Sequence, residues 1–129
     1  MANTFKVIIV DDNSAFLEGL TSLIETDNKY EVVATYTSGD ELLKYDKLNT
    51  VDLLLLDVEM PGLGGIKTAQ LINFDYPRIK IIAITMYQEK VYLTQLIESG
   101  FLGFVNKTNV SEELFETIDR IIKGELCFP

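Results

Sequence analysis

The amino-acid sequence predicts an α/β fold, in which a doubly wound, five-stranded parallel sheet is flanked by helices on both faces. Strand and helix signals alternate five times along the chain, which implies right-handed crossovers between parallel strands. Two strand signals, residues 53–56 and 79–84, are almost wholly apolar, as expected of strands covered on both faces. The 129 residues, with 47% hydrophobic content, suit a single domain over residues 1–129.

The first third of the chain predicts two strands and two helices. Residues 5–10 are β-branched and apolar, and the polar residues 11–14 predict a loop and a helix start. Residues 31–36 form a more polar strand signal, which favours an edge position. Ser38 and Glu41 have capping-box spacing at the start of a short second helix. The expected apolar positions are Phe16, Leu20, Leu23 and Ile24 in the first helix, and Leu42, Leu43 and Leu48 in the second.

The most informative stretch is residues 52–65, where the apolar run stops at Asp57. Open α/β sheets bind their ligands at the carboxyl ends of central parallel strands, so Asp57 is the first candidate for chemistry. Pro61 ends the strand because it cannot donate a hydrogen bond to a neighbouring strand. A tight turn is then permitted by three glycines, Gly62, Gly64 and Gly65.

The second half of the chain repeats the alternation. The strand over residues 79–84 ends at Thr85, and a helix over residues 91–99 is stopped by Gly100. A strand over residues 101–105 is followed by Asn106 and Lys107. A third helix, which must end before Pro77, is predicted by the helical spacing of Ile66, Ala69 and Ile72. A fifth helix is predicted from residues 109–112 onward. Its apolar positions at helical spacing are Leu114, Phe115, Ile118, Ile121 and Ile122.

Composition and charge exclude several classes of function. Twenty acidic against eleven basic residues give a net charge of -9, which disfavours binding of this chain to nucleic acid or to an anionic membrane. The absence of histidine excludes a Ser/His/Asp triad, a histidine-ligated zinc site and an internal phosphohistidine. Cys127 is the only cysteine, so no internal disulfide can form, and no secretory or membrane-spanning segment is recognisable. We therefore expect a cytoplasmic protein.

Five side chains are expected to meet at one edge of the sheet, because they follow the carboxyl ends of four strands: Asp11, Asp12, Asp57, Thr85 and Lys107. Three such carboxylates repel one another by roughly 4 kcal/mol per pair at about 4 Å and an effective dielectric of about 20, so the cluster requires a cation. All-oxygen ligands favour Mg²⁺ held partly by a phosphate oxygen. Lys107 can meet an anion and Thr85 can donate a hydrogen bond, so the group describes a phosphoryl site with Asp57 as the nucleophile.

Each of these residues taken alone has an ordinary structural explanation. Asp11 and Asp12 could complement the dipole of the following helix, and Asp57 could cap its own turn. Thr85 is common at a strand end, and a single lysine such as Lys107 is most often a solvated surface charge. These separate explanations do not account for the joint occurrence of the residues at four strand ends.

Four segments together resemble the receiver domain of two-component response regulators. They are residues 10–12 (Val-Asp-Asp), 56–62 (Leu-Asp-Val-Glu-Met-Pro-Gly), 84–85 (Ile-Thr) and 104–107 (Phe-Val-Asn-Lys), and they span nearly the whole chain in order and spacing. The resemblance implies a flavodoxin-like (CheY-like) sheet of strand order 2-1-3-4-5 with five helices. It also implies a phosphoprotein in a phosphorelay that is not itself an enzyme, although it would assist its own phosphoryl transfer and dephosphorylation.

By this resemblance, Asp57 accepts a phosphoryl group from a histidine kinase or a small phosphodonor. Asp12, Asp57 and the backbone carbonyl of Glu59 would bind Mg²⁺ directly, and Asp11 would bind it through water. Thr85 and Phe104 would form a switch pair, in which the hydroxyl moves toward the phosphoryl group and the aromatic ring turns inward. The movement would alter the face made by the helix over residues 91–99, the next strand and the last helix.

Two positions near the switch depart from the family pattern. Thr108 follows Lys107 where many receivers have proline, and the aromatic switch residue is Phe104 rather than tyrosine, which leaves it without a phenolic hydrogen bond. Glu59 and Tyr87, two positions beyond Asp57 and Thr85, are expected to flank the attacking water and to influence the lifetime of the phosphoryl group.

The tail after Ile121 resembles the receiver end of regulators of the NarL/LuxR (FixJ) type. We therefore expect residues 123–129 to begin a linker to a missing helix-turn-helix domain, which would contact DNA and control transcription. Homodimerisation on phosphorylation is a further expectation.

Other function classes remain open at this point. A stand-alone receiver or a phosphorylation-independent interaction module would have almost the same sequence. A phosphatase of the haloacid dehalogenase kind also uses a strand-end aspartate, but its motif is Asp-x-Asp-x-Thr, whereas here Glu59 and Met60 follow. A flavin-binding module would place the flavin phosphate against Asp11 and Asp12, which would repel it.

Overall fold

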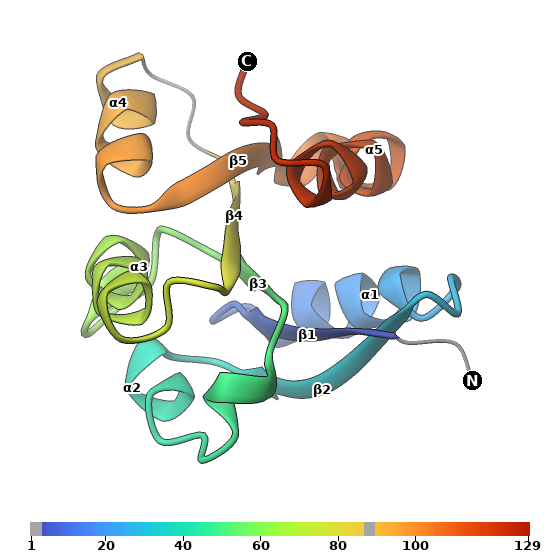
Figure 1. The fold of residues 1–129 in the computed structure, drawn as a ribbon, viewed down its shortest axis with the longest axis horizontal. Coiled ribbons are helices and arrows are strands. Elements are labelled where there is room, and N and C mark those ends of the chain that lie inside the picture. The colour runs from blue at the N-terminus through green and yellow to red at the C-terminus, as the bar shows by residue number, and fades with distance from the viewer. Residues whose placement is uncertain (1–3, 87–89) are drawn as a thin grey trace.

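The structure, a computed structural model, describes residues 4–86 and 90–129 and has three layers (Figure 1). The central layer is one sheet of five parallel strands in the order β2-β1-β3-β4-β5, which confirms the predicted fold class and strand order. The strands are β1 (Phe5–Val10), β2 (Tyr30–Tyr36), β3 (Leu53–Leu56), β4 (Lys80–Thr85) and β5 (Phe101–Asn106). β2 lies at an edge, as its more polar sequence indicates.

Among the described residues, two α-helices cover one face of the sheet and three cover the other (Figure 1). The first pair is α1 (Ser14–Ile24) and α5 (Val110–Ile122), and the second group is α2 (Gly39–Leu42), α3 (Gly64–Asp75) and α4 (Lys90–Glu98). Residues 4–86 and 90–129 also contain two short 3₁₀ helices, Leu48–Thr50 and Lys107–Asn109. In the part of the chain that the structure describes, no helix has the length and apolar character needed to cross a bilayer.

The middle strand of the sheet, β3, connects both halves of the core. Leu54 and Leu56 pack toward α2, α3 and α4, while Leu53 and Leu55 pack toward α1 and α5, because side chains along a strand alternate in direction. All four are at most 2% exposed, which confirms the predicted central strand. Their burial places the next residue, Asp57, at the carboxyl end of the middle strand.

The buried face of α1 differs slightly from the sequence prediction. Its buried residues are Leu17, Leu20 and Ile24, while Phe16 and Leu23 are only partly buried. The Asn13 side chain caps the helix by accepting a hydrogen bond from the Phe16 N–H, at 3.0 Å. The helix therefore presents Leu17 to the core, and Phe16 lies at the margin near the strand ends.

The predicted second helix is also shorter than expected. The Ser38 cap is confirmed, since its Oγ accepts from the Glu41 N–H at 3.2 Å, but α2 ends at Leu42. Beyond this point the hydrogen bonds follow the tighter pattern of a 3₁₀ turn, for example from the Tyr45 N–H to the Leu42 carbonyl at 3.0 Å. Leu48 is buried, but it belongs to the separate helix Leu48–Thr50.

The chain folds back on the sheet after α5. Gly124 has a φ of 94°, a left-handed conformation that suits glycine at a helix end. Cys127 then forms a single parallel bridge with Gly103 of β5. Part of the predicted linker start, residues 123–129, thus lies against the edge of β5.

Candidate functional site

The carboxyl ends of the strands bring three acidic side chains together. Asp11 follows β1 and Asp57 follows β3, and Val10 and Leu56, which precede them, are paired in neighbouring strands. One carboxylate oxygen from each of Asp11, Asp12 and Asp57 lies within 4.8 Å of the others. Asp11 is 1% exposed and Asp57 3% exposed, whereas Asp12 is open to solvent. The predicted cluster is therefore present, with two buried acids and one exposed acid.

Lys107 places a positive charge inside this cluster. Its Nζ lies 2.7 Å from Asp11 Oδ2 and 3.3 Å from Asp57 Oδ2, and 16% of its side chain is exposed. The contact with Asp57 has hydrogen-bond geometry, while the contact with Asp11 is a close ion pair. Buried carboxylates require compensating charge. One ammonium group balances one of the two buried acids, so the site keeps a negative charge that favours a second cation.

Burial and charge repulsion weaken the acidity of Asp57. Removal from water and the nearby Asp11 carboxylate raise the pKa of Asp57 from 3.8 to about 6, although Lys107 and the Glu59 N–H act to lower it. Burial lowers the pKa of Lys107, but its pairs with Asp11 and Asp57 raise it more, so the net shift is upward. At neutral pH the site therefore holds an ionised Asp57 beside a fixed ammonium group.

Backbone hydrogen bonds orient both buried acids. The Asn13 N–H donates to Asp11 Oδ1 at 2.8 Å, and the Glu59 N–H donates to Asp57 Oδ1 at 3.2 Å. The start of α3 lies against the same turn, because a Cβ on Gly65 would collide with the carbonyl oxygen of Asp57. The glycine-rich stretch thus lets α3 approach the strand end closely, which holds the Asp57 turn in place.

Thr85 and Phe104, the predicted switch pair, share one face of the sheet. Phe104 pairs with Ala83, and Thr85 lies two residues beyond Ala83 on the same side of β4. Thr85 is 1% exposed, and within residues 4–86 and 90–129 its hydroxyl has no hydrogen-bond partner. A buried unpaired hydroxyl is costly, so an acceptor that arrives at the strand end would stabilise it. The Phe104 ring is already buried, at 5% exposure.

The turn that carries Lys107 is closed by Asn106 rather than by proline. Asn106 Oδ1 accepts hydrogen bonds from the Thr108 N–H at 2.9 Å and from the Thr108 hydroxyl at 2.7 Å. Proline could make neither bond, so threonine here provides a different means of fixing the turn. The Glu59 side chain is exposed, and Tyr87 lies outside the described residues.

Sequence reasoning did not assign Phe16 to the site. The Lys107 Nζ lies 4.7 Å from the centroid of the Phe16 ring, within the range of a cation–π interaction. On the sequence, Phe16 is one of several apolar residues at helical spacing, which indicates core packing. Only its position in the first turn of a helix that starts at the strand ends could have pointed to the site.

A match to one protein family covers most of the chain. Residues 7–119 match the response regulator receiver domain. The response regulator GacA of Pseudomonas syringae pv. syringae (strain B728a) is 31% identical over 120 residues, covering 93% of this chain and 56% of that protein. The nitrate/nitrite response regulator protein homolog of Haemophilus influenzae is 31% identical over 126 residues, covering 98% of this chain and 61% of that protein. The chain thus spans little more than half the length of these relatives.

Solved structures agree with the sequence matches. A two-component response regulator of the LuxR family from Aurantimonas sp. SI85-9A1 has a TM-score of 0.89 and 30% identity, covering 97% of this chain and 89% of that chain. The isolated REC domain of RcsB from Salmonella enterica serovar Typhimurium, in the presence of phosphomimetic BeF₃⁻, has a TM-score of 0.88 and 25% identity, covering 98% of this chain and 94% of that chain. The chain therefore belongs to the response regulator receiver domain family, and its relatives are regulators of the NarL/LuxR type.

Proposed function

We propose that Asp57 is the phosphoacceptor of this receiver domain and takes one phosphoryl group from a histidine kinase. The observation that carries the proposal is the buried Asp57 carboxylate at the end of the middle strand, 3.3 Å from the Lys107 ammonium. An acid whose pKa is raised to about 6 by burial destabilises the fold when it is ionised, and such groups concentrate at functional sites. The match to the receiver family supports the same assignment.

Three side chains take part in the proposed phosphoryl transfer, each in a different role. A carboxylate oxygen of Asp57 forms the new bond to phosphorus, while the bond from phosphorus to the donor nitrogen or oxygen breaks and the leaving group keeps the electron pair. Lys107 offsets negative charge on the transferred phosphoryl oxygens. The Thr85 hydroxyl donates a hydrogen bond to one of these oxygens. The nucleophile, the positive charge and the hydrogen-bond donor thus come from three different strand ends.

The acid cluster fits Mg²⁺. Its donors are all carboxylate oxygens, one from each of three aspartates within 4.8 Å, and hard cations prefer such ligands. We assign Asp12, Asp57 and the backbone carbonyl of Glu59 as direct ligands, and Asp11 as a ligand through water. When bound, the ion would neutralise charge between the acids and the incoming phosphoryl group. The exposure of Asp12 leaves this side of the cluster open to solvent.

The proposed output is a change in the face made by α4, β5 and α5, which Thr85 and Phe104 transmit. One solved RcsB structure, 25% identical to this chain, is described as two dimers bound to two parallel DNAs. We infer from such relatives that this receiver, in the cytoplasm, controls a DNA-binding domain that follows residues 123–129, and that it dimerises on phosphorylation. The net charge of -9 argues that the receiver itself does not contact DNA.

Intact mass after incubation with acetyl phosphate and Mg²⁺ tests the proposal. The wild type should gain one phosphoryl group, and it should gain none when Mg²⁺ is removed by a chelator. Asp57→Asn should gain none with Mg²⁺ present, whereas the matched control Asp75→Asn, an exposed acid at the end of α3, should behave as wild type. Equal gains in the wild type and Asp57→Asn would overturn the assignment and favour a phosphorylation-independent interaction module.

A further inference from the structure

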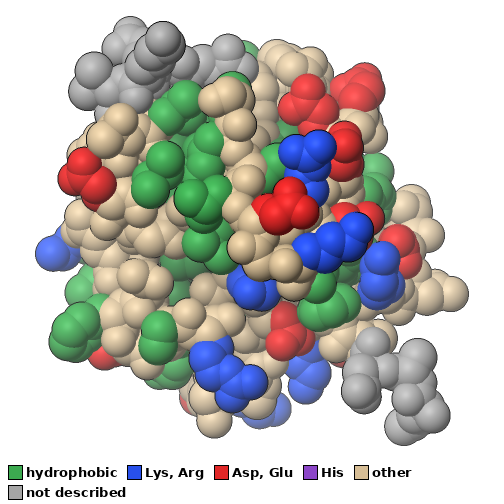
Figure 2. Space-filling view, turned by 45° about the horizontal axis from the view of Figure 1, so that its top comes forward, with side chains coloured by type: hydrophobic (Ala, Val, Ile, Leu, Met, Phe, Trp, Pro, Cys, Tyr) green, Lys and Arg blue, Asp and Glu red, His purple; other side chains and the backbone are tan. Residues whose placement is uncertain are grey.

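We propose that residues 125–129 form a latch strand, which docks on β5 while Asp57 is unphosphorylated and leaves when the phosphoryl group is present. This inference rests on the proposed phosphorylation of Asp57. The latch strand returns after α5 to the upper side of the molecule in Figure 1, where the C-terminus lies. Figure 2 turns this side forward and shows hydrophobic side chains gathered beside a mixed group of acidic and basic ones.

Two backbone hydrogen bonds attach the latch strand to the outer edge of β5. The Cys127 N–H donates to the Leu102 carbonyl at 2.9 Å, and the Phe104 N–H donates to the Cys127 carbonyl at 3.0 Å. Together they form the parallel bridge between Cys127 and Gly103. The edge of β5 would otherwise expose these groups, so the latch strand covers an open sheet edge. One of its two bonds is made directly with the predicted switch residue.

β5 is shaped to receive the latch strand at Gly103. A Cβ on residue 103 would lie 3.1 Å from the Cys127 carbonyl oxygen and 2.5 Å from Cδ1 of Ile121 in α5. Both separations are tighter than an ordinary contact to a Cβ. A glycine inside a strand weakens the strand, and it often marks a place where another backbone approaches closely. Here it lets α5 and the latch strand reach the same point of β5.

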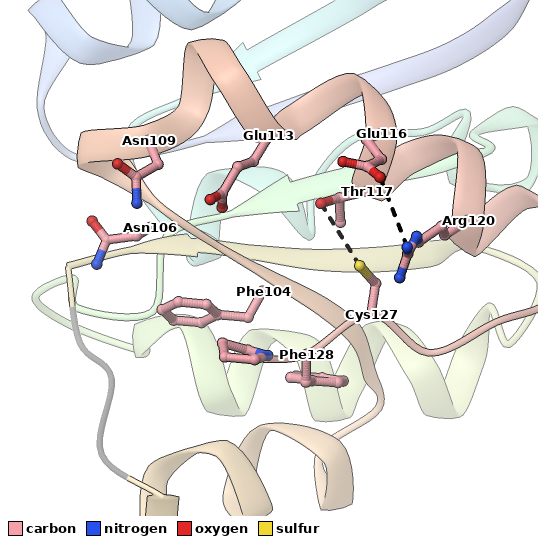
Figure 3. A pocket seen from close by; sticks show the side chains of 10 residues that line it. Phe104, Asn106, Asn109, Glu113, Glu116, Thr117, Arg120, Cys127 and Phe128 are labelled. Atoms are coloured by element: carbon pink, nitrogen blue, oxygen red, sulfur yellow. Dashed lines mark hydrogen bonds and ion pairs between the residues drawn. The ribbon is translucent and has the colours of Figure 1, made fainter.

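The side chains of the latch strand point alternately, as in a β-strand. Cys127 faces α5, with its Sγ 3.8 Å from Thr117 Oγ1, whereas Phe128 packs on the other half of the core, which contains Phe104. Figure 3 shows Cys127 directed toward Thr117, and Phe104 and Phe128 away from α5 on the opposite side of the pocket. The latch strand is therefore joined to the surroundings of Phe104 through both its backbone and its side chains.

The attachment is weak enough to be reversible. The next bond in this register would run from the N–H of residue 129 to the Phe104 carbonyl, but Pro129 has no N–H. Between the latch strand and α5 lies a cavity of about 350 Å³, lined in part by Asn109, Glu113 and Arg120. Two backbone hydrogen bonds to β5, one bond from the Glu125 N–H to the Arg120 carbonyl, the thiol contact with Thr117 and the packing of a partly buried Phe128 are few attachments, which places this segment at the low end of local stability.

Thr85 and Phe104 connect the phosphorylation site to the latch strand. A phosphoryl group on Asp57 attracts the Thr85 hydroxyl, which has no hydrogen-bond partner among the described residues. Its movement leaves space on the face of the sheet that it shares with Phe104, and packed interiors do not keep such voids. When the Phe104 ring fills this space, Phe128 loses its packing surface and the bond to the Cys127 carbonyl is strained. The latch strand then detaches from β5.

Cys127 provides the test, because it is the only cysteine of the chain and lies within the latch strand. The full chain is incubated with Mg²⁺, with and without acetyl phosphate, and the intact mass gives the phosphoryl occupancy of each sample. Cys127 is partly buried while the latch strand is docked, so the rate at which a maleimide labels its thiol should rise when the latch strand detaches. Loss of the contacts of one aromatic side chain should make the phosphorylated wild type react roughly tenfold faster than the unphosphorylated protein.

Three variants separate release of the latch strand from other causes. Phe128→Ala removes the packing of the Phe128 ring on the core, so Cys127 should react fast with and without the phosphoryl group. Phe104→Leu removes the aromatic ring that couples Thr85 to the latch strand. Cys127 should then be labelled at the same rate with and without the phosphoryl group. The double variant Cys127→Ser, Leu126→Cys moves the thiol to a position that is 57% exposed in the wild type, where labelling should be fast and independent of phosphorylation.

The outcomes for the latch strand and for the proposed function are distinct. A chain that gains the phosphoryl group but reacts no faster at Cys127 overturns release of the latch strand and leaves the phosphoacceptor role intact. A chain that gains no phosphoryl group overturns the proposed function, and release with it. Equal labelling rates in unphosphorylated wild type and Phe128→Ala overturn the docked latch strand itself.

Discussion

Asp57 should make the stability of the metal-free protein depend on pH. Its pKa of about 6 in the folded state lies above the ordinary value of 3.8, so the folded protein binds this proton more tightly than the unfolded chain does. The stabilisation that results is complete below about pH 4 and is lost as the pH rises through about 6. Above that range the ionised, buried Asp57 lowers the free energy of unfolding.

Asp57→Asn should therefore stabilise the metal-free fold at neutral pH. The amide cannot ionise, and Lys107 keeps Asp11 as a partner at 2.7 Å, so we expect a gain of roughly 1–2 kcal/mol. The gain should shrink toward zero at about pH 4, where the wild-type carboxyl is largely protonated. Urea unfolding at the two pH values measures it, and a less stable variant at neutral pH would show that the carboxylate is well accommodated in the fold.

Phe16→Leu should slow phosphorylation, because it removes the ring beneath Lys107. The Nζ lies 4.7 Å from the ring centroid, and a contact of this kind contributes about 0.5–1 kcal/mol, so the initial rate with acetyl phosphate should fall roughly two- to fivefold. Phe16→Tyr keeps an aromatic ring and should retain the wild-type rate. If the Leu and Tyr variants react equally fast, the ring does not position Lys107.

The residues of the site differ in how far sequence alone could place them. The sequence alone predicts one shared site for Asp11, Asp57 and Lys107, because parallel strands have their carboxyl ends at one edge of the sheet. Phe16 could not be assigned, because an apolar residue on an amphipathic helix has the same sequence signature whether it meets the core or a cation. The orientation of α1 about its axis buries Leu17 in the core and places the Phe16 ring beside Lys107.

Two helical glycines offer a matched test of how α3 is held against the site. Gly65→Ala should destabilise the fold by about 1–3 kcal/mol, because its Cβ would meet backbone atoms of Asp57 and Val58, which cannot move aside cheaply. Gly19→Ala, in α1, would meet no atom within 4 Å and should stabilise the fold by about 0.5–1 kcal/mol. Thermal unfolding of the two variants checks both signs. If Gly65→Ala leaves the unfolding temperature unchanged, the close approach of α3 to the turn after Asp57 is not needed for stability.

For the helices and strands, the local sequence pattern predicted which elements form, and of which type, better than it predicted where each element ends. Leu48 has a spacing compatible with the second helix, but the chain changes to 3₁₀ hydrogen bonds soon after Leu42, and periodicity does not distinguish the two. Residues 125–129 are too few for any periodic signal. Their pairing depends on Gly103, a residue distant in sequence whose missing side chain creates the docking point.

The whole fold was predictable because every level of the sequence agrees with it. Five alternations of strand and helix, two apolar central strands and glycine at the helix ends all specify the same parallel sheet, and consistency of this kind characterises foldable sequences. As a receiver domain the chain is a signalling module rather than an enzyme of the classical kind. The acidic cluster proposed as its phosphorylation site lies at one edge of the sheet, which leaves the faces of the helices available for the proposed output.

Borohydride reduction of the acetyl phosphate-treated protein, followed by peptide mass spectrometry, tests the central claim most directly. Borohydride converts an aspartyl phosphate into homoserine and leaves free carboxylates unchanged. We predict homoserine at residue 57 alone, formed only when Mg²⁺ and acetyl phosphate are both present. Homoserine at Asp11 or Asp12, or a phosphate on Thr85 that survives the reduction, would contradict the assignment of Asp57 as the phosphoacceptor.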